Sequence, residues 1–129
     1  MERIAASHGV EVIGVVGGTG VNQLEGLTNI RVKSVVTPFG APSADITIAE
    51  LQGQNILFLP RHGIGHRIPP SEINFRANIY ALKSLGCTQL ISISAVGSLK
   101  EHLAPGTFVI VDQFIDRTFA RRKSFFGPG

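Results

Sequence analysis

The chain has 129 residues and a mass of 13.8 kDa, a length that fits one domain and excludes a multidomain protein. Hydrophobic residues make up 43% and charged residues 16% of the sequence, which excludes global disorder, and a single cysteine, Cys87, excludes an internal disulfide. The formal net charge is +3, but residues 117–123 hold four of the 12 basic side chains, so the rest of the chain lacks the positive charge typical of a nucleic-acid-binding protein.

Short apolar runs predict a chain made mainly of β-strands. In chain order these runs are residues 11–16, 30–36, 45–51, 55–60, 89–94 and 107–112. Residues 11–16 are an apolar, β-branched run, as in a strand buried on both faces of a parallel sheet, and residues 89–94 are expected to form another buried strand. The runs on either side of Gln52-Gly53-Gln54 fit a β-hairpin, and the glycine and prolines of residues 37–43 indicate a loop.

One segment has the periodicity of an amphipathic helix. Apolar residues recur every four positions across residues 71–85, after Pro69-Pro70 and before the helix-ending residue Gly86. Strands combined with a helix and glycine-rich turns predict an α/β fold with a mixed, twisted sheet and helical crossovers. One helix leaves a face of such a sheet largely uncovered, and residues 124–129 form a loop without a closing element. We therefore expect residues 1–129 to be a fragment of one larger domain.

Three loops follow predicted strands at the position where open α/β sheets bind ligands. The loop Gly17-Gly18-Thr19-Gly20 offers backbone N–H groups and a hydroxyl to an anion. Arg61 offers a planar fork of donors beside His62, and Ser94 offers a hydroxyl followed by backbone amides. Each loop also fits a purely structural interpretation. The glycine-rich loop can be a plain strand-to-helix turn, the loop of Arg61 a solvated turn, and Ser94 a strand-end residue bonded to backbone.

The three loops together predict one phosphate pocket, provided that their strands are neighbours. No acid–base pair accompanies them, which suits a reaction in which phosphate itself is the nucleophile. His66 and Arg67 are interpreted as residues of a solvated turn. A metal site at His62 and His66 is not expected, because their loop contains no carboxylate and a spacing of four aligns two ligands only on a helix.

The order of the motifs along the chain is more informative than any one of them. The motifs are Val15-Val16-Gly17-Gly18-Thr19-Gly20, residues 37–43, Arg61-His62-Gly63 with His66, Asn74 with Ala77-Asn78, residues 95–99 and residues 111–118. In this order they resemble the methylthioadenosine phosphorylases, which belong to the trimeric branch of the purine nucleoside phosphorylase superfamily. The resemblance implies a phosphorylase/hydrolase-like fold and runs from about Val12 to the last residue.

The same resemblance implies which residues bind phosphate. These residues are Thr19, Arg61, His62, Ser94 and Ala95. Ser94 stands where close relatives often have threonine, so the hydroxyl is kept. Because family members are much longer, the resemblance also implies that the carboxylates that protonate the purine lie beyond Gly129. No catalytic residue is assigned within this chain, and the isolated chain is expected to have little or no activity.

The activity implied by the resemblance is phosphorolysis of S-methyl-5′-thioadenosine to adenine and 5-methylthioribose 1-phosphate, a pentosyltransferase reaction of purine and methionine salvage. Inorganic phosphate is then a co-substrate, no cofactor or metal is needed, and the assembly is a homotrimer. Two alternatives stay open. The first is a purine nucleoside or methylthioinosine phosphorylase. The second is a catalytically inactive remnant that binds phosphate or forms oligomers.

The sequence also bears on location and partners. It contains no run of about 18 uncharged apolar residues, and its first residues lack the basic-then-apolar order of a signal peptide. The single cysteine is typical of a reducing compartment. We therefore expect a cytoplasmic protein that binds a purine nucleoside and phosphate, and neither a membrane nor nucleic acid.

Overall fold

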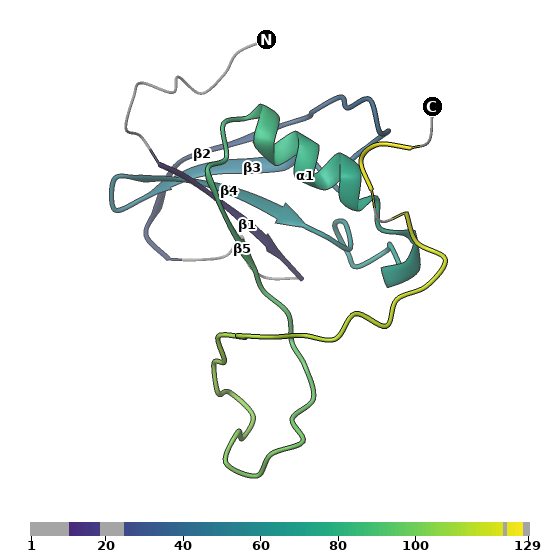
Figure 1. Ribbon diagram of the computed structural model, residues 1–129. Coiled ribbons are helices and arrows are strands. Elements are labelled where there is room, and N and C mark those ends of the chain that lie inside the picture. Colours follow the sequence, from purple (N-terminus) through teal and green to yellow (C-terminus); the bar gives the residue numbers. More distant parts are fainter. Residues whose placement is uncertain (1–10, 19–24, 123, 128–129) are drawn as a thin grey trace. The chain divides into compact units, whose positions relative to one another are not determined.

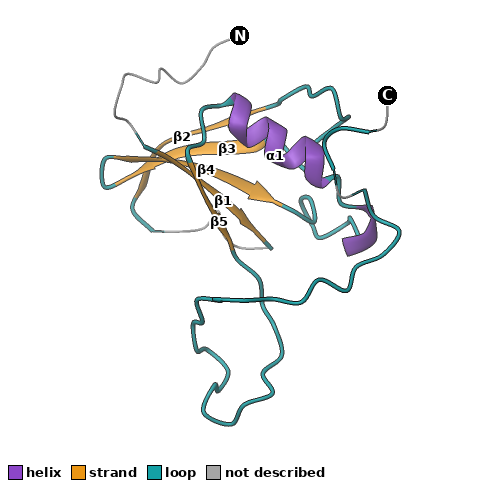
Figure 2. Cartoon of the chain, viewed as in Figure 1, coloured by secondary structure: helices purple, strands orange, loops and turns teal. Residues whose placement is uncertain are grey.

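A mixed β-sheet of five strands organises the first part of the chain (Figures 1 and 2). The computed structural model describes residues 11–18, 25–122 and 124–127, which fall into two units, Met1–Ser94 and Ala95–Gly129. The elements of the first unit are β1 (Val12–Gly17), β2 (Leu27–Lys33), β3 (Ile46–Leu51), β4 (Gln54–Pro60), a 3-10 helix (Pro70–Glu72), α1 (Phe75–Ser84) and β5 (Gln89–Ser92). The second unit consists of loops and turns throughout its described residues.

β1 lies in the interior of the sheet, whose strand order is β2-β3-β4-β1-β5. It pairs in parallel with β4 on one side and with β5 on the other, so Val15 stands opposite both Phe58 and Ile91. The pairs β2–β3 and β3–β4 are antiparallel. This mixed sheet, with α1 on the connection from β4 to β5, confirms the predicted α/β fold. It also places the carboxyl ends of β4, β1 and β5 next to one another.

α1 lies across one face of the sheet (Figure 1). The main core cluster joins the buried side of α1 to this face and consists of Val12, Val16, Ile46, Ile48, Leu57, Leu59, Ala81, Leu82, Leu85 and Cys87. Burial of a side chain such as Leu57 contributes about 1.5–3 kcal/mol. A smaller cluster on the opposite face consists of Val15, Ala49, Ile56 and Phe58. In the described part of the chain, no helix is long and apolar enough to cross a membrane.

The ends of α1 are set by the residues that flank it. The helix lies within the predicted residues 71–85 but begins only at Phe75, because Asn74 is its N-cap and accepts a hydrogen bond from the backbone N–H of Ala77 at 3.2 Å. At the other end Gly86 has a positive φ of 96°. The N–H groups of Gly86 and Cys87 bond back to the carbonyls of Lys83 and Leu82, the two bonds of a Schellman motif.

The β3–β4 connection confirms the predicted hairpin. Only Gln52 and Gly53 separate the strands, and both have positive φ, 50° and 81°. Two central residues with positive φ define the type I′ turn, whose twist matches that of the flanking strands. The resulting register places Leu51 opposite Gln54 and Ile48 opposite Leu57.

Two strand predictions are wrong. β5 ends at Ser92 and is an edge strand whose four residues are all exposed, so the run 89–94 is not a strand buried on both faces. Residues 107–112 are not a strand, although Val109, Ile110 and Val111 have the composition of one. A strand requires a hydrogen-bonded neighbour, and among the described residues none pairs with this segment.

Gly14, in the middle of β1, allows the turn after α1 to pack closely on the sheet. A Cβ at this position would lie 2.6 Å from Sγ of Cys87 and 3.2 Å from Cδ1 of Leu90. The Cys87 thiol donates to the carbonyl of Gln89 at 3.0 Å, and burial raises the pKa of this thiol, which favours its protonated form. The space at Gly14 therefore determines how closely β1 and β5 are joined.

The substitution Gly14→Ala is expected to destabilise the chain by about 1–3 kcal/mol, because the added methyl group overlaps the Cys87 sulfur. Adding Cys87→Ala in the same chain removes this nearest contact and should restore part of the stability. Urea unfolding midpoints measure both effects. Gly97→Ala is the control, because a Cβ there meets nothing within 4 Å. Equal midpoints for Gly14→Ala and Gly97→Ala would contradict the expectation.

Candidate anion-binding site

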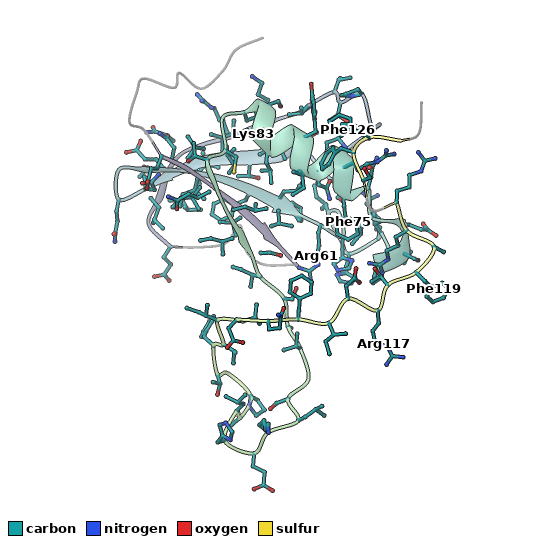
Figure 3. The ribbon with its side chains drawn as sticks, viewed as in Figure 1. Arg61, Phe75, Lys83, Arg117, Phe119 and Phe126 are labelled. Atoms are coloured by element: carbon teal, nitrogen blue, oxygen red, sulfur yellow. The ribbon has the colours of Figure 1, made fainter. Side chains whose placement is uncertain are left out.

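The carboxyl ends of β4, β1 and β5 lie next to one another. The backbone N–H of Arg61 bonds to the carbonyl of Gly17 at 2.9 Å, and that of Ile93 bonds to the carbonyl of Val16 at 2.8 Å. These bonds continue the two parallel pairings to the ends of the strands. The condition placed on the predicted pocket, that its three strands are neighbours, is confirmed. Figure 3 shows the labelled Arg61 side chain at this edge of the sheet.

The guanidinium of Arg61 is held by two contacts. Its Nε donates to Nε2 of His62 at 3.2 Å, and its Nη1 donates to the carbonyl of Ile93 at 2.6 Å. Arginine has five N–H groups, so these two bonds leave three without a described partner. No carboxylate in the described part of the chain forms an ion pair with Arg61. A half-buried cation with fixed orientation and unused donors is suited to bind an anion.

His62 is buried, and both of its ring nitrogens have partners. Nδ1 lies 2.8 Å from the carbonyl oxygen of Ile68, which can only accept, so Nδ1 is assigned as the donor. Nε2 of the neutral ring is then the acceptor for Arg61. The ring of the exposed His66 stacks on that of His62 with 4.1 Å between centroids and an interplanar angle of 24°. The imidazole of His62 is therefore fixed at its edge and on one face.

A closed loop presents Arg61 and His62. The N–H of Gly63 bonds to the carbonyl of Pro60 at 3.0 Å, and the N–H of Ile68 bonds to the carbonyl of His62 at 2.9 Å. Gly63 has φ 72°, and a Cβ there would lie 3.0 Å from the backbone oxygen of Ser43. Glycine at this position therefore satisfies both the backbone conformation and the close approach of Ser43.

Two asparagines of the α1 segment tie the loop of residues 37–43 to the helix. Asn78, which is only 2% exposed, accepts from the N–H of Ser43 at 2.8 Å and donates to its hydroxyl at 2.9 Å. Asn74 donates to the carbonyl of Phe39 at 2.7 Å. Because the backbone oxygen of Ser43 lies against Gly63, the bonds from Asn78 to Ser43 also support the loop that contains Gly63. Sequence reasoning gave the asparagines no role of their own, and the available signal was two asparagines four residues apart on an otherwise apolar helix face.

The structure brings together some of the predicted site residues. Arg61 contacts both His62 and the Ile93–Ser94 peptide, whose carbonyl belongs to Ile93. Ser94 ends the first unit, is exposed, and its hydroxyl makes no hydrogen bond with described residues. The structure does not test whether Thr19 and Ala95 lie beside Arg61. Thr19 lies outside the described residues, and Ala95 begins the second unit and is described with it.

Gly18, His66 and Arg67 lie next to the predicted site residues in the sequence. A Cβ at Gly18 would meet nothing within 4 Å, so the backbone before Thr19 borders open space. Arg67 donates through Nε to the carbonyl of Ile64 at 2.9 Å, a contact within its own loop, whereas His66 has the stacking role that sequence reasoning missed. Over the described ranges, no three His, Cys, Asp or Glu side chains gather as a possible metal site.

Comparison with known proteins identifies the class to which this fold and site belong. The family model described as "Phosphorylase superfamily" matches residues 12–129, and the chain belongs to this superfamily. Among curated proteins, S-methyl-5′-thioadenosine phosphorylase of Rhodospirillum rubrum is 58% identical over 118 residues, which are 92% of this chain and 40% of the relative. The enzyme of the same name from Geobacter sulfurreducens is 56% identical over 120 residues, 92% of this chain and 42% of the relative.

Solved structures agree with this assignment. Methylthioadenosine phosphorylase from Schistosoma mansoni in complex with adenine has a TM-score of 0.83 and 45% sequence identity, covering 92% of this chain and 43% of that chain. An enzyme of the same name from an antarctic soil metagenomic library has a TM-score of 0.70 and 52% identity, covering 74% of this chain and 33% of that chain. The chain thus spans about two fifths of the length of the curated relatives named above.

The substitution Asn78→Ala is expected to cost about 1–3 kcal/mol of stability, because it leaves the backbone N–H and the hydroxyl of Ser43 without their buried partner. Chemical denaturation measures the loss. The matched control is Lys83→Ala, an exposed position of the same helix, with an expected change within about 0.5 kcal/mol. A loss at Asn78 no larger than at Lys83 would contradict the supporting role of Asn78.

Proposed function

We propose that this chain supplies the phosphate-binding part of an S-methyl-5′-thioadenosine phosphorylase. The observation that carries the proposal is the guanidinium of Arg61, held at Nε and Nη1 where three parallel strands end, with three N–H groups left for an anion. An oxygen of inorganic phosphate forms a bond to the anomeric carbon of the nucleoside while the bond from that carbon to the purine nitrogen breaks. The products are adenine and 5-methylthioribose 1-phosphate.

Phosphate is bound in this proposal by Thr19, Arg61, His62, Ser94 and Ala95. The Arg61 fork pairs with two phosphate oxygens, and the hydroxyls of Thr19 and Ser94 and the N–H of Ala95 donate to the remaining oxygens. Donors fixed before the reaction hold the anion against the positive charge that develops on the ribose ring. Positioning and charge stabilisation are then the chain's main contributions to the rate.

The leaving adenine needs a proton, and the described residues do not assign its donor. No described carboxylate forms a hydrogen bond or an ion pair with Arg61, His62 or Ser94. The adenine complex of the Schistosoma mansoni relative supports adenine, rather than hypoxanthine or guanine, as the base released. The family resemblance further supports a cytoplasmic homotrimer in purine and methionine salvage, with phosphate as co-substrate and neither cofactor nor metal.

Arg61→Ala is expected to raise the phosphate concentration needed for half-maximal rate by about 100-fold, because a bidentate, charge-assisted contact is lost. Arg61→Lys should recover only part of this loss, because an ammonium group lacks the planar fork. The rates are measured in a chimera in which residues 12–129 replace the matching region of the Rhodospirillum rubrum relative.

Arg67→Ala is the matched control, because this arginine lies in the same loop and, among the described residues, its side chain hydrogen-bonds only to the carbonyl of Ile64. It should leave the phosphate dependence unchanged. Consumption of S-methyl-5′-thioadenosine by the chimera in the absence of phosphate would overturn phosphorolysis as the reaction. An Arg61→Ala chimera with unchanged phosphate dependence would instead remove Arg61 from the site.

A further inference from the structure

We propose that His66 binds the ribose of the nucleoside, through a hydrogen bond between its imidazole and a hydroxyl group of the sugar. The inference rests on the proposed function, in which Arg61 binds phosphate. It adds a contact to the part of the substrate that phosphate attacks. The sequence pattern around His66 indicates only a solvated turn, so the structure supplies the evidence for this role.

The ring of His66 forms an outer layer beside the candidate site. It lies within 24° of parallel to the buried ring of His62, with 4.1 Å between the two centroids. His62 in turn contacts Nε of Arg61 through its Nε2 at 3.2 Å. His66 is itself exposed and lies one ring beyond the group that holds the arginine. A ligand that extends from Arg61 toward solvent on this side therefore meets His66.

The imidazole of His66 has hydrogen-bonding groups that no described residue uses. A neutral ring has one donor and one acceptor, and within the described ranges neither ring nitrogen of His66 has a hydrogen-bond partner. Both ring nitrogens of His62, by contrast, are occupied. An alcohol both donates and accepts hydrogen bonds, so either nitrogen of His66 is suited to bind a sugar hydroxyl.

The backbone of His66 has a conformation that is uncommon for residues with a side chain. Its φ is 54°, in the left-handed region, and the loop already uses glycine for such values at Gly63 and Gly65, with φ of 72° and 74°. Residues held in sparsely populated conformations cluster at ligand sites, where the surrounding structure offsets their cost. The strain at His66 thus fits a side chain that is placed to contact a ligand.

The geometry of the proposed reaction places the ribose hydroxyls on the phosphate side of the sugar. Phosphate attacks the anomeric carbon on the face opposite the departing purine, so that the forming and breaking bonds are aligned. In a ribonucleoside the 2′- and 3′-hydroxyls project from that same face. A side chain beside the phosphate-binding arginine can therefore reach a hydroxyl while the purine lies on the other face, and His66 has this position.

Titration of the 129-residue chain with inorganic phosphate and with α-ribose 1-phosphate tests the inference without a purine. NMR shifts of the backbone amides give both dissociation constants. His66→Gly should weaken binding of ribose 1-phosphate about fivefold, the loss of one neutral hydrogen bond, and change phosphate binding less than about twofold. His66→Asn should recover part of the loss, because asparagine tolerates positive φ and its amide still donates and accepts.

Two controls separate a hydroxyl contact from a general effect on the loop. Glycine adopts the φ of 54° without strain, so the urea midpoint of His66→Gly should stay close to that of the unchanged chain. Arg67→Ala, in the same loop, should leave the ratio of the two affinities unchanged. The 2-deoxy and 3-deoxy analogues of ribose 1-phosphate identify the hydroxyl, because His66→Gly should have an effect below about twofold on the analogue that lacks it.

The two proposals fail in different ways. Equal weakening of both ligands by His66→Gly would overturn the ribose contact, since His66 would then support the phosphate site only by stacking on His62. An unchanged affinity for ribose 1-phosphate, or a fivefold loss that persists with both deoxy analogues, would also overturn it. A chain that binds neither ligand, or phosphate binding unaffected by Arg61→Ala, would instead overturn the assigned phosphate site together with this inference.

Discussion

The parallel pairing of β1 with both β4 and β5 is the constraint on which the candidate site depends. Because the three strands run in one direction, they end at the same edge of the sheet. Residues 17, 61 and 93 therefore lie at that edge although they are distant in sequence. The ladder continues through the N–H groups of Arg61 and Ile93 to the last residues of β1. The small volume of Gly14 allows this close junction, since a larger residue would collide with Cys87.

A second set of contacts links the site to the core through polar groups rather than apolar ones. The buried side chain of Asn78 holds both the N–H and the hydroxyl of Ser43, and the carbonyl of Ser43 lies against Gly63. Buried polar groups contribute little net energy but cost much when left without a partner. This asymmetry makes them effective at selecting one loop conformation. The orientation of Arg61 and His62 thus rests on a helix that contributes no predicted phosphate ligand.

The successes and errors of the sequence analysis have one physical origin. The hairpin at Gln52-Gly53, the interior strand β1 and the stop at Gly86 were predictable, because turn chemistry and hydrophobic periodicity act over a few residues. Two predictions were wrong, namely a strand at 107–112 and the burial of 89–94. An apolar run indicates the preference of its side chains for a strand, but it does not show that a neighbouring strand is present to pair with it. The placement of Thr19 and Ala95 beside Arg61 stays a prediction.

The sequence by itself determined the chemical groups of this protein and their positions at strand ends: the glycine-rich loop after β1, Arg61 and His62 after β4, and Ser94 near the end of β5. Only the tertiary structure decided how those groups contact one another. The bonds from Arg61 to Ile93 and from Asn78 to Ser43 join residues 32 and 35 positions apart, and even the Ile68 carbonyl reaches His62 through loop geometry. Such contacts depend on the path of the backbone in three dimensions, which no local pattern of residues encodes.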